Sequence, residues 1–230
     1  MATIDAGSMA GLETFEGINI DYEKAYQNNK FKIACVTKAN SMLPSGSRVL
    51  DVGCGTGIPV SQMLSQAGLD VVGFDISPKM VQLAQSRVKG SFSVANMAEY
   101  EVEEGNFSGI FMIFAHLQMS YAASASAWGI IVFGQSPADH HVKEESAYDV
   151  TRTYVEDYNV PFMGEPLPTF LMSAEGQRNF FRSMGLEIVS ETIDLFQPDN
   201  PRCDPEMQQY IIAKRSGAGP ISQPLPLPKA

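Results

Sequence analysis

The sequence predicts an α/β fold, a Rossmann-like, doubly wound and mostly parallel seven-stranded sheet with an antiparallel last strand. Short apolar runs alternate along the chain with segments of helical spacing, and this alternation is typical of a parallel sheet covered by helices. The first apolar run, Arg48–Val52, leads directly into the glycine loop Gly53-Cys54-Gly55-Thr56-Gly57, as a strand does in folds that bind nucleoside-containing ligands. A second run ends in an acid, Asp75, at the spacing that such folds use for a ribose contact.

The expected elements follow in chain order. A helix is predicted from Asp21 to Leu43, where Pro44, Ser45 and Gly46 break it before the first strand. Further helices are expected over 59–67, 78–88 and 174–184, and further strands over 71–74, 91–94, 109–114, 129–134, 186–193 and 208–214.

The segment between the fourth and fifth strands is short. Only Ala115–Trp128 is available there, and its second half has few residues to bury. A parallel crossover needs about a dozen residues. The sheet can therefore close, but we expect a shortened helix at this point and a thinly covered flank that would favour a homodimer.

Three other segments lie outside the simple alternation. Residues 1–20 are expected to form an N-terminal arm, and residues 21–215 a single domain. An insertion at 135–171, rich in Tyr, Asp, Glu and Pro, is longer than a simple loop and is predicted to be a lid over a ligand. The proline-rich segment 216–230 is expected to be a disordered tail.

Composition limits the partners. A formal charge of −10 and a pI near 4.7 argue against nucleic acid, which requires a basic face, and favour small molecules. Cys35, Cys54 and Cys203 are scattered and form no ligand pair with the three histidines, so neither disulfides nor a metal site is predicted. No signal peptide or membrane-spanning run is evident, and we expect a reducing, cytoplasmic location.

Asp51, the acid at the start of the glycine loop, indicates the charge of the ligand. A glycine loop before a helix offers backbone N–H groups to an anion such as a pyrophosphate. Asp51 would repel a pyrophosphate, but it suits a ligand that carries a positive charge beside a carboxylate. In addition, Ile58 follows Gly57 where the dinucleotide fingerprint has its last glycine.

Two further polar residues follow strands. Asp75 is the expected ribose ligand, although a turn or helix-capping role is the simpler alternative. Asn96 follows the third strand, where it could contact a purine or form a turn.

The chain resembles the class I S-adenosylmethionine-dependent methyltransferases, in particular the small-molecule group of quinone biosynthesis (type 11). The resemblance extends from about residue 22 to residue 215. It rests on LDVGCGTG at 50–57, GFDISPKMVQLAQ at 73–85, VANMAEY at 94–100 and GIFMIFAHLQMS at 109–120.

The resemblance implies a cofactor and a set of contacts. The cofactor would be S-adenosyl-L-methionine, with S-adenosyl-L-homocysteine as the product. The residues expected to bind it are Tyr22, Asp51, Gly53, Cys54, Gly55, Gly57, Asp75, Ile76, Met80, Asn96, Met97 and Ala115.

Methyl transfer requires little chemistry from the protein, because the leaving group is a neutral thioether. Positioning supplies much of the rate, and a base is needed only if the acceptor must lose a proton. His116, just beyond the fourth strand, is the first candidate base, and Tyr121 is expected to orient the acceptor. His140 and His141 are weaker candidates, and a polar residue satisfied by the backbone is the simpler interpretation of His116.

Three functions are consistent with these patterns. The first is methyl transfer to a small-molecule metabolite by in-line displacement at the sulfonium methyl. The second is a cyclisation or rearrangement enzyme on the same fold, since fold does not fix the reaction. The third is a non-catalytic scaffold that binds S-adenosylmethionine.

Overall fold

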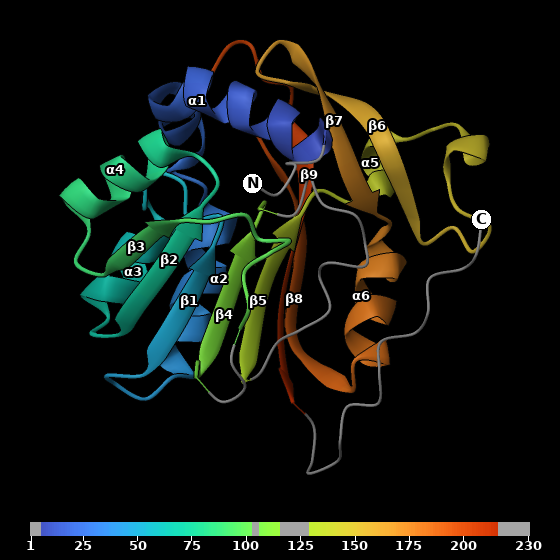
Figure 1. Cartoon of the computed structure of the whole chain (residues 1–230). Helices are drawn as coiled ribbons and strands as arrows, with labels where there is room; N and C mark the ends of the chain where they lie inside the picture. The colour runs from blue at the N-terminus through green and yellow to red at the C-terminus, as the bar shows by residue number, and fades with distance from the viewer. Residues whose placement is uncertain (1–5, 103–105, 116–128, 216–230) are drawn as a thin grey trace.

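A computed structural model describes residues 6–102, 106–115 and 129–215 of the chain (Figure 1). The helices are α1 (Ala6–Tyr26), α2 (Lys30–Ser41), α3 (Val60–Gln66), α4 (Pro78–Arg87), α5 (Ala138–His141) and α6 (Ala174–Ser183), with a 3-10 turn η3 (Glu145–Ala147). The strands are β1 (Arg48–Val52), β2 (Asp70–Asp75), β3 (Ser91–Val94), β4 (Gly109–Ile113), β5 (Ile130–Gln135), β6 (Tyr154–Phe162), β7 (Glu165–Met172), β8 (Leu186–Phe196) and β9 (Glu206–Arg215).

Seven strands form one sheet in the order β3-β2-β1-β4-β5-β9-β8. The five strands from β3 to β5 pair in parallel, whereas β9 runs antiparallel to both β5 and β8. This arrangement confirms the predicted fold, including the antiparallel last strand. The order reverses between β1 and β4, and open α/β sheets bind ligands beyond the carboxyl ends of the strands at such a switch point.

Helices cover the two faces of the sheet differently. On one face, α2, α3 and α4 pack a continuous apolar core against the strands, with Val36, Leu64 and Val81 among its buried members. On the other face, α6 covers β5, β8 and β9 through Phe180 and Phe181. The helices thus hold the parallel strands rigidly and leave their carboxyl ends open for a site.

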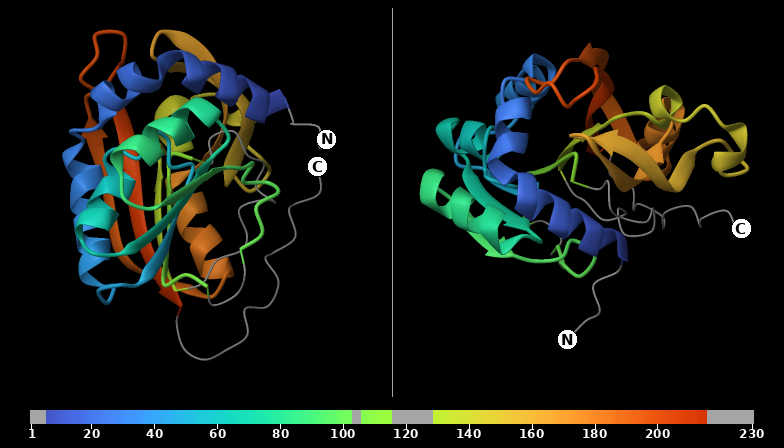
Figure 2. Two further views of the ribbon diagram at one scale, coloured as in Figure 1. Left: turned by 60° about the vertical axis from the view of Figure 1, so that its left-hand side comes forward. Right: turned by 90° about the horizontal axis from the view of Figure 1, so that it is seen from above.

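The predicted helix over 21–43 is wrong in one respect, because the chain forms two helices there. The break lies at Asn29, whose side-chain oxygen accepts hydrogen bonds from the N–H groups of Phe31 and Lys32 and so caps α2. The preceding helix, α1, continues back to Ala6, across the expected arm boundary at residue 20. It lies across the carboxyl ends of the parallel strands (Figures 1 and 2).

Much of the predicted lid segment is a β-hairpin. Strands β6 and β7 pair antiparallel as a separate two-stranded sheet, and their inner face packs on α5 through Val142, Leu167 and Leu171. Seen from above, α1 lies between the side of the molecule that carries α4 and the side that carries the hairpin (Figure 2). The hairpin therefore adds a second wall beside the carboxyl ends of the sheet.

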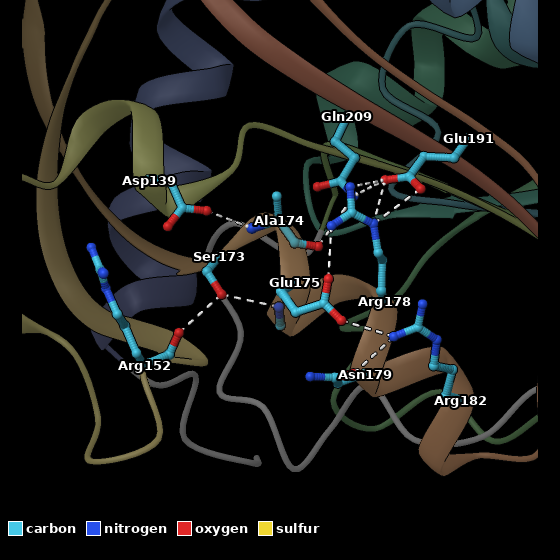
Figure 3. Close-up of polar contacts among 11 residues, drawn as sticks. Asp139, Arg152, Ser173, Ala174, Glu175, Arg178, Asn179, Arg182, Glu191 and Gln209 are labelled. Carbon is cyan, nitrogen blue, oxygen red and sulfur yellow. Dashed lines mark hydrogen bonds and ion pairs between the residues drawn. The ribbon is translucent and has the colours of Figure 1, made fainter.

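The short helix α5 is fixed to the start of α6. The Asp139 carboxylate accepts from the N–H of Ala174 at 2.7 Å, beside the N-cap hydroxyl of Ser173 (Figure 3). Helix α6 is in turn tied to β8 by its Arg178, which pairs with Glu191 at 2.9 Å. These bonds position the end of α5, where His141 lies.

None of the helices within the described ranges is long and apolar enough to cross a membrane. The expected short crossover after Ala115 and the expected tail at 216–230 lie outside those ranges.

Candidate functional site

A cleft opens at the carboxyl ends of β1, β2, β3 and β4, on both sides of the switch point. Its empty space is about 740 Å³, including open solvent at its mouth, and α1 contributes Phe15 and Tyr22 to its wall. Its lining consists of Phe15, Tyr22, Gly53, Gly55, Phe74, Asp75, Ile76, Met80, Ala95, Asn96, Met97, Ile113, Phe114 and Ala115.

The glycine loop brings bare backbone to the floor of the cleft. Gly53 has a φ of +65°, and a Cβ there would lie 2.5 Å from the Cβ of Ala115. Gly57 has a φ of +80° and packs against α4, where a Cβ would lie 2.9 Å from the Val88 side chain. Only glycine adopts this conformation freely, so Gly53 lets the loop pass close to Ala115, and Gly57 lets it pack closely against α4.

Asp75 connects the loop to β2 and faces the cleft. Its Oδ2 accepts from the Gly55 N–H and its Oδ1 from the Ser77 N–H, both at 2.9 Å. Burial raises the pKa of this carboxyl, opposed by hydrogen bonds from the Ser77, Gly55 and Ile76 backbone. Each carboxylate oxygen retains accepting capacity, so the side chain can hold the loop and still accept hydrogen bonds from a diol.

Asp51 does not line the cleft. It is 3% exposed, and Ser61 on α3 donates to its Oδ2 at 2.5 Å. Burial raises its pKa to about 7; the Ser61 bond and the Lys32 charge oppose the rise, and the Asp75 charge adds to it. Its contact with the ligand stays a prediction, since the carboxylate lies behind the loop.

The opposite end of the cleft is apolar. Phe74, Ile76, Met80 and Met97 supply its walls, as a flat heterocycle requires. The Oδ1 of Asn96 accepts from the Ala98 N–H at 3.0 Å, so this residue does form the turn that was the alternative interpretation. Its side-chain amide nitrogen is the group left to donate to a ligand in the cleft.

Tyr22 lies in an aromatic cluster rather than on the sheet. Its ring centroid is 5.4 Å from that of Phe15, 4.8 Å from that of Tyr26 and 5.8 Å from that of Phe162. Phe162 belongs to β6, so this cluster joins α1 to the hairpin. Tyr22 and Tyr26 therefore pack between the two elements that flank the cleft mouth.

A second cavity adjoins the first on the hairpin side. Its empty space is about 480 Å³, including open solvent at its mouth, and Phe15, Tyr22 and Phe114 line both cavities. Phe114, at the end of β4, has a φ of +59°, and non-glycine residues held in this region cluster at functional sites. The other lining residues are Tyr26, Ser136, His141, Val160, Pro161, Phe162, Leu167, Thr169, Leu171 and Glu206.

Several predicted site residues are not in either cavity. His116 and Tyr121 lie outside the described residues. Cys54 and Gly57 belong to the loop but do not line the cleft. Of the two weaker candidates for the base, His141 lines the second cavity and His140 does not.

Phe15, Phe162 and Glu206 line the second cavity without having been predicted from the sequence. Phe15 falls in the expected arm, and Phe162 and Glu206 precede or follow turns without any motif. The position of an acid in a cavity wall, at the start of the last strand, is a signal that only the fold reveals. Among the described residues, no group of three or more His, Cys, Asp or Glu could hold a metal ion.

Comparison with known proteins identifies the motif region. Residues 49–128 match the family model of the methyltransferase domain. Magnesium-protoporphyrin O-methyltransferase of Rhodobacter capsulatus is 43% identical over 61 residues, which cover 24% of this chain and 27% of that protein. That protein and two other similar methyltransferases each match this chain over less than a third of their own length.

The fold comparison extends over most of the chain. 1,6-Didemethyltoxoflavin-N1-methyltransferase of Burkholderia thailandensis, solved with its substrate and S-adenosylhomocysteine, superposes with a TM-score of 0.64 and 15% identity over 94% of this chain and 93% of that one. Magnesium protoporphyrin IX methyltransferase from Synechocystis, with bound S-adenosylhomocysteine, superposes with a TM-score of 0.61 and 17% identity. That match covers 91% of this chain and 100% of the other.

Proposed function

Because this chain belongs to the class I S-adenosylmethionine-dependent methyltransferases, we propose that it transfers a methyl group from S-adenosylmethionine to a small-molecule acceptor. The observation that carries the proposal is the Asp75 carboxylate, which faces the cleft and accepts from Gly55 of the glycine loop. Magnesium protoporphyrin IX and 1,6-didemethyltoxoflavin, the substrates that two similar proteins are named for, are small molecules too.

The residues present fit the cofactor. Asp75 would accept hydrogen bonds from the ribose diol, and the backbone of Gly53 and Gly55 would lie against the rest of the donor. Ile76, Met80 and Met97 would enclose the adenine. The bound cofactor supplies an activated methyl group on a sulfonium.

The protein's contribution is binding, orientation and exclusion of water. The first cavity would hold the donor and the second the acceptor, with the wall that they share between them. Holding two reactants in line converts an encounter in solution into a reaction within one complex, which can account for much of the rate. The hairpin and α1 cover the acceptor side, so they serve as the lid that the insertion was predicted to be.

Other parts of the proposal rest on the sequence alone. His116 as base, Tyr121 as orienting group, Asp51 as donor contact and the homodimer remain predictions. The charge of −10 disfavours a nucleic-acid partner, and the scattered cysteines favour a reducing, cytoplasmic setting.

Calorimetric titration tests the donor site first. S-adenosylmethionine and S-adenosylhomocysteine should each bind the purified chain, and absence of binding to a folded sample would overturn the cofactor assignment. A screen of metabolites followed by mass spectrometry then tests the reaction. A gain of one methyl group in the acceptor supports methyl transfer, an isomeric product indicates a rearrangement enzyme, and donor binding without turnover indicates a scaffold.

A further inference from the structure

The second cavity is lined mostly by apolar and aromatic side chains. Phe15, Phe114 and Phe162 form part of its wall, and Val160 and Leu167 of the hairpin complete the apolar surface. Walls made of aromatic rings favour a flat, largely apolar ligand. Such a cavity binds its ligand by area and needs few polar groups to orient it.

Among its polar groups, Glu206 is a carboxylate held in a fixed orientation. Gln208 donates to its Oε1 through Nε2 at 2.5 Å. The side-chain amide oxygen of Gln208, Oε1, accepts from Asn29 Nδ2 at 2.5 Å and from the Tyr210 hydroxyl at 2.6 Å. Because two donors hold that oxygen, the amide nitrogen is the end that faces Glu206. Asn29, Gln208 and Tyr210 are all buried, whereas Glu206, at the end of this chain of bonds, is partly exposed.

Charged and titratable groups surround Glu206 from several elements. Lys32 on α2 and Tyr26 on α1 stabilise its charged form, together with Gln208. Tyr22 and Tyr210 are close enough that the Glu206 charge raises their pKa, in addition to the effect of burial. Cys203, in the loop before β9, is close to it as well, and its pKa is raised by burial and by the same charge.

Burial dominates these effects and raises the pKa of Glu206 to about 7. Lys32 stabilises the charge, but burial lowers its own pKa to about 8, so it compensates only partly. His141, which also lines the second cavity, has a pKa lowered to about 4 by burial and by His140 and Lys143. A base works best when its pKa is near the working pH, which favours Glu206 over His141.

Resting on the proposed function, we propose that Glu206 is the general base for an acceptor hydroxyl, and that the acceptor is a flat aromatic compound bearing that hydroxyl. The acceptor oxygen forms a bond to the methyl carbon as the bond from that carbon to sulfur breaks, and sulfur keeps the electron pair. The hydroxyl proton moves to the Glu206 carboxylate. One carboxylate and one sulfonium charge are neutralised together, so the step leaves no net charge buried.

A binding experiment tests this without turnover. The probes are 2-naphthol and 2-methoxynaphthalene, added at pH 8 to protein saturated with S-adenosylhomocysteine. Loss of the hydrogen bond from the hydroxyl to the cavity carboxylate should make Glu206→Gln bind 2-naphthol about tenfold more weakly or worse. The affinity for 2-methoxynaphthalene should change less than about twofold, as befits a ligand without that proton. Glu187→Gln, an exposed position on β8 paired with Lys214, is the matched control and should leave both affinities unchanged.

The pH dependence of the same binding gives a second readout. In the unaltered protein, 2-naphthol should bind more weakly at pH 6 than at pH 8, because Glu206 gains a proton across that range. The variant should show no such change, and neither should 2-methoxynaphthalene.

Each contrary result has its own meaning. Equal losses for both probes in Glu206→Gln, or no loss for either, would overturn the role of Glu206. Failure of the unaltered, product-loaded protein to bind 2-naphthol would overturn the acceptor class. Failure to bind S-adenosylhomocysteine would instead overturn the proposed function. The experiment therefore distinguishes a wrong donor site from a wrong base or acceptor class.

Discussion

The backbone N–H of Gly55 donates to the Oδ2 of Asp75 at 2.9 Å, so the acid after the second strand holds the glycine loop after the first. If Asp75 also binds the ribose, as proposed, one carboxylate couples the glycine loop to the donor. Any change at Asp75 is therefore expected to disturb the loop as well as the diol contact.

Asp75→Asn should weaken S-adenosylmethionine binding at least tenfold in calorimetry. In the carboxylate, one oxygen accepts from Gly55 and the other from Ser77. The amide has an NH₂ group in place of one of these oxygens, so one of the two hydrogen bonds is lost. Asp70→Asn, at the exposed start of the same strand, is the control and should bind normally. Unchanged affinity in the Asp75 variant would show that the carboxylate is only a turn-forming group.

Phe162→Ala should loosen α1 from the hairpin. The ring contacts Phe15, Tyr22 and Tyr26, and its loss should lower the free energy of unfolding by about 2 kcal/mol, less than for a fully buried ring. Limited proteolysis should then cut within α1 faster than in the unaltered chain. Val150→Ala, at an exposed position in the same insertion, should show neither effect. Equal cutting rates in both variants would mean that the cluster does not hold the helix.

Glu206→Gln should change how stability depends on pH. The folded pKa of about 7 lies above the ordinary 4.5, so the folded chain keeps a proton that the unfolded chain loses between those values. The unaltered protein should therefore lose stability as pH rises from about 4.5 to 7, by up to about 3 kcal/mol. The variant lacks this loss, although weaker attraction to Lys32 offsets part of its gain above pH 7.

Thermal melting from pH 4 to pH 8 measures this difference. The two proteins should melt alike near pH 4 and diverge above pH 5, with the variant the more stable. Glu187→Gln should follow the unaltered curve, since that side chain is exposed. Parallel curves for the unaltered protein and Glu206→Gln would contradict the burial of charge at this position.

His116→Ala and Glu206→Gln together separate the two candidate bases. With an acceptor found in the metabolite screen, Glu206→Gln should lower turnover about 100-fold and remove the loss of rate below pH 7. His116→Ala should lower turnover less, keep that pH dependence and leave donor affinity unchanged. If the pH dependence disappears in the His116 variant instead, the sequence-based choice of base is correct.

The sequence predicts the sheet well because its signals are local. The third strand was expected over 91–94 and occurs at Ser91–Val94, and the acid at Asp75 falls at the end of β2 as its spacing required. The split between α1 and α2 had a local signal too, since Asn29 is a residue type that favours helix starts. That signal was missed because the apolar spacing continues across it.

The second cavity is different in kind. Phe15, Phe162 and Glu206 come from α1, β6 and β9, which are far apart along the chain and meet only when the hairpin packs beside α1. No spacing rule connects them. The raised pKa of Glu206 likewise depends on burial by several elements at once, so it has no counterpart in the sequence pattern.

The wall shared by the two cavities has a thermodynamic consequence. Phe15, Tyr22 and Phe114 line both, so a molecule that moves these rings while filling one cavity reshapes the other. If donor occupancy changes acceptor affinity by some factor, the acceptor must change donor affinity by the same factor, because such coupling is reciprocal. We therefore expect these three side chains to couple the two ligands, so that each helps or hinders the other, without any contact between subunits or any distant regulatory site.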